Sequence, residues 1–204
     1  MSPRVNEQNQ QIRDKRKQQL LAAGAKVFGE RGYAGTKVSD IVGEAQLSHG
    51  LIYHYFSSKE DIYMELAKMA FTTSYDTIHQ AVNSNGSPYE RLKAMTEEIL
   101  AHTRESGYFF LIALQTNTSK TVPEQASAIS AEYSAKSLEL LTHLFQQGQK
   151  HGEFIKADPS QQALMYTSML NGVVFTRLTY PSLERFPQVD QILRAFINTS
   201  SVKE

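Results

Sequence analysis

The stretch TKVSDIVGEAQLSHGLIYHYF, residues 36–56, decides how the rest of the chain is interpreted. Apolar residues recur in it at helical spacing in two short runs, which predict helices over 37–44 and 48–56. The connection between them, residues 45–47, leaves room only for a tight turn. Two short helices joined in this way have the proportions of a helix-turn-helix, which can place its second helix in the major groove of DNA.

The second predicted helix separates its side chains by chemistry. At about 100° per residue, the aliphatic side chains and Phe56 take one side of the helix, and the polar-tipped rings take the other. The first side holds Leu51, Ile52, Tyr55 and Phe56, and the second holds His49, Gly50, Tyr53 and His54. Imidazole and phenol groups donate and accept hydrogen bonds, which suits the reading of base edges. We therefore predict that the second side is exposed and available to DNA.

Other interpretations of this stretch stay open. Helix-turn-helix spacing is common in all-α proteins, and Tyr53 and Tyr55 can be half-buried core residues with hydrated hydroxyls. A zinc site is not expected, because His49 and His54 are five residues apart and do not share a helix face.

Composition places the chain among folded, cysteine-free proteins. It has 204 residues, of which 41% are hydrophobic and 21% charged, so a sizeable core is expected. The absence of cysteine excludes disulfides and thiol catalysis. The first seventeen residues contain no apolar run, and no segment offers the roughly 20 apolar residues of a membrane span. We expect a cytoplasmic protein with no membrane segment, cofactor or metal ion.

Charge is divided unevenly along the chain, although the formal net charge is zero. Residues 1–59 hold nine basic and five acidic side chains, a net charge of +4, and the remainder holds 12 and 16, a net charge of −4. A basic N-terminal part predicts contact with an anion. Thr36, Lys37 and Lys59 stand at expected helix N-termini, where unpaired N–H groups favour phosphate.

Helical periodicity continues through the rest of the chain, and the fold class is predicted as all-α with about nine helices. The first helix ends at Gly32 in a left-handed conformation, and Gly24 in its middle lets another helix approach closely. Ser57 with Glu60 is a predicted capping box. Three short helices precede residue 57, and longer ones begin near 58, 88, 107, 123, 159 and 187.

Residues 20–66 resemble the DNA-binding domain of the tetracycline-repressor (TetR) family of transcriptional regulators. The matching elements are Ala22-Ala23 and Phe28, Gly32-Tyr33, Thr36, Ile41, Ser48, Gly50, Tyr53, Phe56 and Lys59-Glu60. Two positions depart from the family pattern, which usually has alanine where this chain has Val42 and glycine where it has Gln46. A left-handed turn at Gln46 would cost on the order of 1 kcal/mol.

The resemblance implies a homodimeric, ligand-responsive regulator that binds a palindromic operator in double-stranded DNA, usually as a repressor. It divides the chain into a DNA-binding domain over 1–57 and an effector-binding and dimerisation domain over 58–204. Together with the residue chemistry, it gives the following candidate DNA contacts: Thr36, Lys37, Ser48, His49, Gly50, Tyr53, His54, Tyr55 and Lys59.

The helix expected over 160–180 is apolar on more than one face, so it needs cover all round. In the TetR family, the penultimate and last helices form a four-helix dimer interface, which maps here to 160–180 and 187–199. The predicted dimer residues are Tyr166, Leu170, Val173, Val174, Arg177, Leu193, Phe196 and Ile197. The alternative is a central helix in the core of a monomer.

A small-molecule effector site requires an apolar pocket with a few polar anchors. Residues on the expected body helices that can line such a pocket are His102, Tyr108, Phe110, Gln115, Tyr133, Tyr166 and Met169. Each of them can equally serve the core, and none identifies a ligand. The resemblance predicts that an effector tilts the long helix over 58–82 and lowers operator affinity.

Two other functions compete with DNA binding. Glu98 with His102 and Glu139 with His143 suggest a di-metal helix bundle, but such bundles use a Glu-x-x-His spacing, and these pairs fit exposed helix surfaces. No catalytic residue is therefore assigned. A helical adaptor whose aromatic face binds a peptide is the second alternative, and it would show no salt-dependent affinity for duplex DNA.

Overall fold

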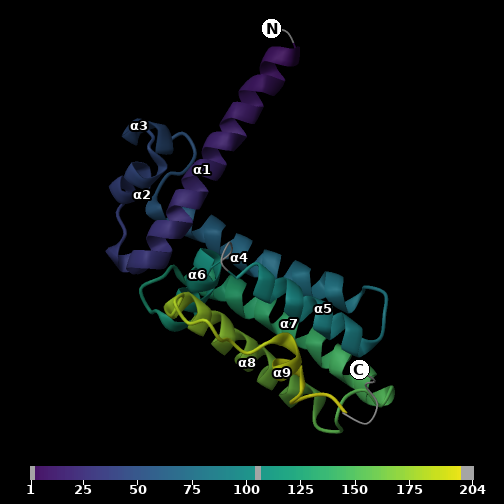
Figure 1. Ribbon diagram of the computed structural model, residues 1–204. Coiled ribbons are helices and arrows are strands. Elements are labelled where there is room, and N and C mark those ends of the chain that lie inside the picture. Colours follow the sequence, from purple (N-terminus) through teal and green to yellow (C-terminus); the bar gives the residue numbers. More distant parts are fainter. Residues whose placement is uncertain (1–2, 104–106, 199–204) are drawn as a thin grey trace. The chain divides into compact units, whose positions relative to one another are not determined.

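The structure is a computed structural model that describes residues 3–103 and 107–198, with side chains described from Gln8 onward. In this part of the chain nine helices form, and two residues pair in an isolated bridge, Phe154 with Ile197. The helices are α1 (Pro3–Gly35), α2 (Val38–Ala45), α3 (His49–Ile52), α4 (Lys59–Val82), α5 (Pro88–Ala101), α6 (Gly107–Thr118), α7 (Glu124–Lys150), α8 (Pro159–Thr179) and α9 (Val189–Leu193) (Figure 1). The all-α prediction is confirmed.

The chain divides into two compact units. The head unit consists of Met1–Phe71 and Tyr108–Ser130, and the body unit consists of Thr72–Gly107 and Ala131–Glu204. The division falls inside α4 and α7, so both helices contribute residues to each unit. The predicted functional boundary at residues 57 and 58 stays a prediction.

The core of the head unit forms where α1 crosses α2 and α4. Leu20, Phe28, Ile41 and Ile62 are each fully buried there. A Cβ atom added to Gly24 would lie 3.0 Å from Ile62 Cγ2, so the glycine permits the close helix approach that the sequence predicts. Ion pairs at the surface add links from α1: Lys26 and Arg31 reach α2 at Glu44 and Asp40, and Lys17 reaches α4 at Glu65.

Helix α6 packs into the head unit through polar contacts. Gln115 Nε2 donates to the carbonyl oxygen of Phe28 in α1 over 2.9 Å. The Tyr63 hydroxyl of α4 and the Thr116 hydroxyl of α6 are 3.0 Å apart in a buried setting. Burial raises the pKa of the Tyr63 phenol. These contacts hold α6 to the helices that carry the helix-turn-helix.

The body unit is built around aromatic side chains. Phe145, Phe154, Tyr166 and Phe196 are all at most 1% exposed, with ring centroids 5.1 to 6.2 Å apart in the contacting pairs. Thr96 donates to the carbonyl oxygen of Leu92, so the Tyr166 hydroxyl donates to Thr96 Oγ1 over 2.8 Å. Burial of this phenol raises its pKa far above the ordinary value.

Three predicted boundaries need correction. The second helix of the helix-turn-helix ends at Ile52 and continues as tight turns, in which His54 N donates to Leu51 O and Tyr55 N to Ile52 O. The cap of α4 lies one residue later than predicted, because Asp61 N donates to the Ser58 hydroxyl. The last predicted helix, 187–199, shortens to Val189–Leu193.

The end of α9 has a tertiary cause. Turns follow Leu193, and from Phe196 onward the backbone pairs with the segment after α7: Ile155 N donates to Phe196 O over 3.0 Å, and Asn198 N donates to Glu153 O over 2.7 Å. Because the Asn198 N–H bonds to Glu153, it does not make the bond to the carbonyl four residues earlier that a continued helix requires. Among the described residues, no helix combines the length and apolar content of a membrane span.

Candidate nucleic-acid interface

The turn between α2 and α3 sets the geometry of the candidate interface. Gln46 follows α2 with φ 53° and ψ 41°, so the chain adopts the left-handed conformation there despite the cost of this conformation for a residue other than glycine. Its N–H donates to Gly43 O over 3.2 Å, and Leu47 N donates to Val42 O over 3.3 Å. Both bonds close the end of α2 and direct the chain into α3.

The side chains of α3 and its following turn separate as the helical wheel predicts. Ile52 and Phe56 are buried at 1% and 5% exposure, whereas Tyr53 is 55% exposed. His49, Gly50 and His54 are also exposed, and Ser48 before them is exposed and makes no capping bond with its side chain. We call Ser48, His49, Gly50, Tyr53 and His54 the recognition surface.

The recognition surface is aromatic, polar and open. The His49 and Tyr53 rings lie one helical turn apart with centroids 5.7 Å from each other. No atom lies within 4 Å of a Cβ atom added to Gly50, so the glycine leaves a shallow point in the surface. Ring edges that carry N–H and O–H groups flank this point. This combination can stack on, or hydrogen-bond to, a planar polar partner such as a base edge.

Four of the predicted DNA contacts lie outside this surface. Thr36 is 2% exposed, and its hydroxyl donates to Gly32 O over 2.7 Å. The Lys59 ammonium donates to Tyr33 O over 3.0 Å and lies 4.3 Å from the centroid of the Tyr33 ring. Tyr55 is half-buried and packs against the head core. Thr36 and Tyr55 therefore support the fold, while Lys37, at the start of α2, is exposed.

The predicted dimer residues are mostly buried within their own unit. Six of them are at most 8% exposed: Tyr166, Leu170, Val173, Val174, Leu193 and Phe196. Ile197 is partly buried, and Arg177 Nη1 donates to Leu100 O over 2.9 Å. These side chains already pack inside the body unit. We therefore take the opposite, exposed face of α8 as the candidate dimer interface.

The outward face of α8 is apolar. We call Leu164, Met165, Ser168, Met169, Gly172 and Phe175 the α8 stripe. At about 100° per residue they fall within an arc of about 140°. Leu164 and Met165 are each 57% exposed, Phe175 is 44% exposed, and nothing lies within 4 Å of a Cβ atom added to Gly172. The sequence shows that α8 is apolar all round, but its pattern does not reveal which face the rest of the unit covers.

The predicted effector residues are divided between the two units. Tyr108, Phe110 and Gln115 belong to the head unit, and His102, Tyr133, Tyr166 and Met169 belong to the body unit. Tyr108 donates its hydroxyl to Glu30 over 3.2 Å, and Tyr133 packs its ring against Tyr75. The effector assignment stays a prediction.

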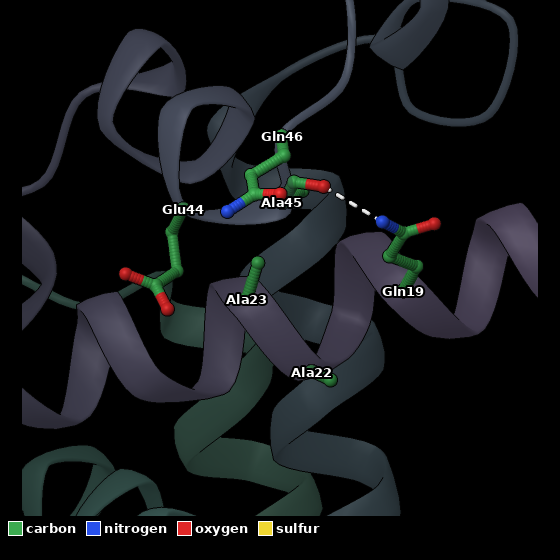
Figure 2. A pocket seen from close by; sticks show the side chains of 6 residues that line it. All are labelled: Gln19, Ala22, Ala23, Glu44, Ala45 and Gln46. Carbon is green, nitrogen blue, oxygen red and sulfur yellow. Dashed lines mark hydrogen bonds between the residues drawn. The ribbon is translucent and has the colours of Figure 1, made fainter.

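Two of the hollows in the described part of the chain are lined by no predicted effector residue. Figure 2 shows the one between α1 and α2, of about 280 Å³, where Gln19 Nε2 donates to Ala45 O over 2.7 Å. Alanine side chains and the Glu44 carboxylate, which pairs with Lys26, make up most of its wall. The other, of about 580 Å³, is lined by Gln146, Gln149, Lys150 and Lys156. In the described part of the chain, no group of three or more His, Asp or Glu residues is placed to hold a metal ion.

Residues 20–66 match the family model described as "Bacterial regulatory proteins, tetR family". These residues contain α2, the left-handed turn and the recognition surface. This segment is a TetR-family domain.

Individual proteins show how far the similarity extends. The HTH-type transcriptional regulator HbdR of Aromatoleum sp. (strain CIB) is 37% identical over 79 residues, which cover 39% of this chain and 34% of HbdR. The matched segment thus spans about a third of that relative's length. The crystal structure of the TetR-family regulator PfmR from Thermus thermophilus is 25% identical, covers 86% of this chain and 93% of PfmR, and superposes with a TM-score of 0.70.

A third protein shares the fold alone. SmeT, the repressor of the Stenotrophomonas maltophilia multidrug efflux pump SmeDEF, has been solved in complex with triclosan. It is 17% identical, with 93% of this chain and 95% of SmeT aligned at a TM-score of 0.72. The TetR fold therefore extends over nearly the whole chain, from the head unit into the body unit.

Proposed function

We propose that this protein is a ligand-responsive transcriptional repressor that binds a palindromic DNA operator as a homodimer. The observation that carries the proposal is the recognition surface: Tyr53 is 55% exposed with His49, Gly50 and His54 beside it, while Ile52 and Phe56 anchor the same segment in the core. An exposed set of hydrogen-bonding rings on the second element of a helix-turn-helix suits base reading in a major groove.

The roles of the contacting groups follow from their chemistry. His49, Tyr53 and His54 present N–H and O–H groups to base edges, and Gly50 allows the helix backbone to approach the duplex closely. Lys37 at the start of α2 supplies an exposed positive charge for phosphate. Because duplex DNA is the proposed partner, we place the site of action in the cytoplasm.

The homodimer is supported by the α8 stripe. Its large apolar side chains are exposed, and Ser168 and Gly172 between them leave space for the backbone of a second helix to approach. A two-fold axis would pair each stripe with the stripe of a second copy, which is the self-complementary arrangement of a homodimer. Two recognition surfaces would then read two half-sites roughly 34–36 Å apart.

A small-molecule effector is the third part of the proposal. Its support is the shared fold with SmeT, which was solved with triclosan bound. We expect an apolar molecule to bind within the body unit, and we expect binding to weaken the operator complex. Coupling of this kind is typically 1–3 kcal/mol, or about 5- to 150-fold in affinity. A compound that raises the melting temperature of the free protein without changing operator affinity would not be such an effector.

The test of the DNA proposal is binding to duplexes selected from a random library. The logarithm of the association constant for the selected duplex should fall linearly with the logarithm of salt concentration, with a slope of about −0.9 for each phosphate contact. A scrambled duplex of the same composition should bind more weakly at every salt concentration. If no sequence is enriched and no salt dependence appears, the protein is not a DNA-binding repressor, and the peptide-binding adaptor becomes the better interpretation.

A further inference from the structure

The N-terminal part of α1 is a feature that the helix-turn-helix does not explain. Figure 1 shows α1 extending well beyond α2 and α3 toward the N-terminus. We call residues 8–18 the N-terminal arm. Nearly all of its side chains are exposed, and Ile12, at 54% exposure, is its one large apolar side chain. An arm with so little apolar surface does not suit pairing with another protein helix.

The charge of the arm is strongly positive. Its eleven residues contain Arg13, Lys15, Arg16 and Lys17, and Asp14 is the one acidic residue among them. Asp14 accepts a hydrogen bond from Gln10 one turn earlier. The cationic side chains therefore remain as the main chemistry that the arm can offer to a partner.

Arg16 Nη1 donates to Gln19 Oε1 on the same helix over 2.9 Å, and the tertiary contacts of Lys17 and Gln19 show which side of α1 faces the helix-turn-helix. Lys17 Nζ lies 2.6 Å from Glu65 Oε1 and 5.7 Å from the centroid of the Phe56 ring, where α3's turn leads into α4. Two residues later, Gln19 Nε2 donates to Ala45 O at the end of α2. The residue that Gln19 contacts precedes α3 in the sequence, and the residues that Lys17 contacts follow it. The sector of the α1 surface between Gln19 and Lys17 therefore faces α3.

Arg13 and Arg16 occupy this sector. With Lys17 at 0° and about 100° per residue, Gln19 lies near 200°, Arg16 near 260° and Arg13 near 320°. The buried residues of α1 that follow, Leu20 near 300° and Val27 near 280°, continue the same line into the core. The face of α1 that carries buried apolar residues inside the head unit thus carries arginines where the helix extends beyond α3. Lys15, near 160°, lies outside the sector.

We propose that Arg13 and Arg16 of the arm bind the phosphate backbone of the operator beside the groove that the recognition surface reads. This proposal rests on the proposed function, since it requires a duplex on α3. The major groove is about 12 Å wide and is bordered by a phosphate strand on each side. A duplex seated on α3 brings one of these strands alongside the sector that carries both guanidinium groups. Arginine suits that position because its planar fork can bind phosphate in a bidentate way.

The test compares single substitutions on one arm. Arg13→Gln, Arg16→Gln and the control Lys15→Gln each remove one positive charge from an exposed position of the same helix. For the Arg13→Gln plus Arg16→Gln protein, we expect affinity to fall about tenfold or more, and the salt slope to become shallower by about 0.9 for each phosphate that the protein no longer neutralises. Selected and scrambled duplexes should lose affinity by the same factor, because phosphate contacts carry no sequence information. Lys15→Gln should change affinity less than twofold.

Several outcomes would overturn the arm proposal while leaving the proposed function intact. One is an arginine double variant with the affinity and salt slope of the wild-type protein on its selected duplex. Another is an equal loss of affinity in Lys15→Gln, which would mean that affinity depends on the net charge of the arm and not on the side of α1 that carries the charge. Circular dichroism of each variant checks that α1 remains helical. By contrast, a wild-type protein that shows no salt-dependent duplex binding would refute the proposed function itself.

Discussion

The recognition surface and the α8 stripe are both exposed helix faces, yet they differ in chemistry. The first carries two histidines, a tyrosine, a serine and a glycine, and it lies within the first 59 residues, whose net charge is +4. The second carries leucine, methionine and phenylalanine, broken only by small residues. Ring N–H and O–H groups favour a polar, planar partner, whereas an apolar stripe is removed from water only when another apolar surface covers it. Exposure therefore identifies a candidate interface, and chemistry decides which class of partner fits it.

The largest expected effect comes from placing charge on the α8 stripe. Met165→Glu with Phe175→Glu puts two carboxylates on each subunit's side of the proposed dimer contact, so the protein should sediment as a monomer at micromolar concentration. Loss of the second recognition surface should reduce operator affinity by about 10²- to 10⁴-fold. The control is Ser134→Glu with Gln146→Glu, which adds the same charge at exposed positions of α7. If the Met165→Glu plus Phe175→Glu protein stays dimeric, this face of α8 is not the dimer interface.

Next in size is the removal of rings from the recognition surface. His49→Ala with Tyr53→Ala should lower affinity for the selected operator about 100-fold, because each good base contact contributes about 1–3 kcal/mol. Affinity for a scrambled duplex should change little, since phosphate contacts remain. Competition binding with both duplexes measures the ratio of the two affinities. Dimerisation should be unaffected. Unchanged operator affinity and specificity would show that these rings do not read bases.

A paired substitution of glycine compares the two faces directly. Gly50 and Gly172 are both helical and exposed, with nothing within 4 Å of an added Cβ atom. Alanine at either position should stabilise the isolated fold by up to about 1 kcal/mol through helix propensity. Gly50→Ala should nevertheless weaken operator binding about tenfold, and Gly172→Ala should weaken dimerisation by a similar factor. If each substitution affects both equilibria equally, the two faces are not functionally distinct.

The smallest expected effect concerns the buried face of α8. Tyr166→Phe removes the hydrogen bond to Thr96 and should lower the free energy of unfolding by about 1 kcal/mol without changing the dimer. Burial raises the pKa of Tyr166, so this phenol stays protonated in the folded protein while the unfolded one ionises near pH 10. Stability that depends on Tyr166 is therefore present below about pH 10 and is lost as pH rises further. Denaturation of wild type and variant from pH 8 to 11 measures the difference.

Sequence reasoning predicted the recognition surface because the two sides of that short helix differ chemically. The apolar side chains of Ile52 and Phe56 favour burial, whereas His49 and Tyr53 each have a polar group that favours solvent. The left-handed conformation at Gln46 was not expected from the sequence, because a glutamine there carries a steric cost that glycine avoids. The sequence does not reveal that the Thr36 side chain turns inward, where its hydroxyl donates to Gly32 O.

The proposed interface on α8 could not be located from the sequence pattern. Tyr166 and Met165 are neighbours of similar apolar character, and a helix that is apolar all round gives no periodic signal to separate them. Only the packing of Tyr166 against Phe145 and Phe196 shows which one is inside. The same holds for the end of α9, which is set by backbone bonds to residues after α7. Effector residues stay a prediction because aromatic side chains look alike in sequence whether they line a cavity or fill a core.

The central claim is that two recognition surfaces, held together through the α8 stripes, read one palindromic operator. Hydroxyl-radical footprinting of the intact protein on its selected duplex tests this most directly. We predict two symmetry-related patches of protection whose centres are separated by about 10–10.5 base pairs, or a multiple of that distance. The Met165→Glu plus Phe175→Glu protein should protect neither patch at the same concentration. A single unpaired patch at saturation, or protection that does not depend on sequence, would contradict this claim.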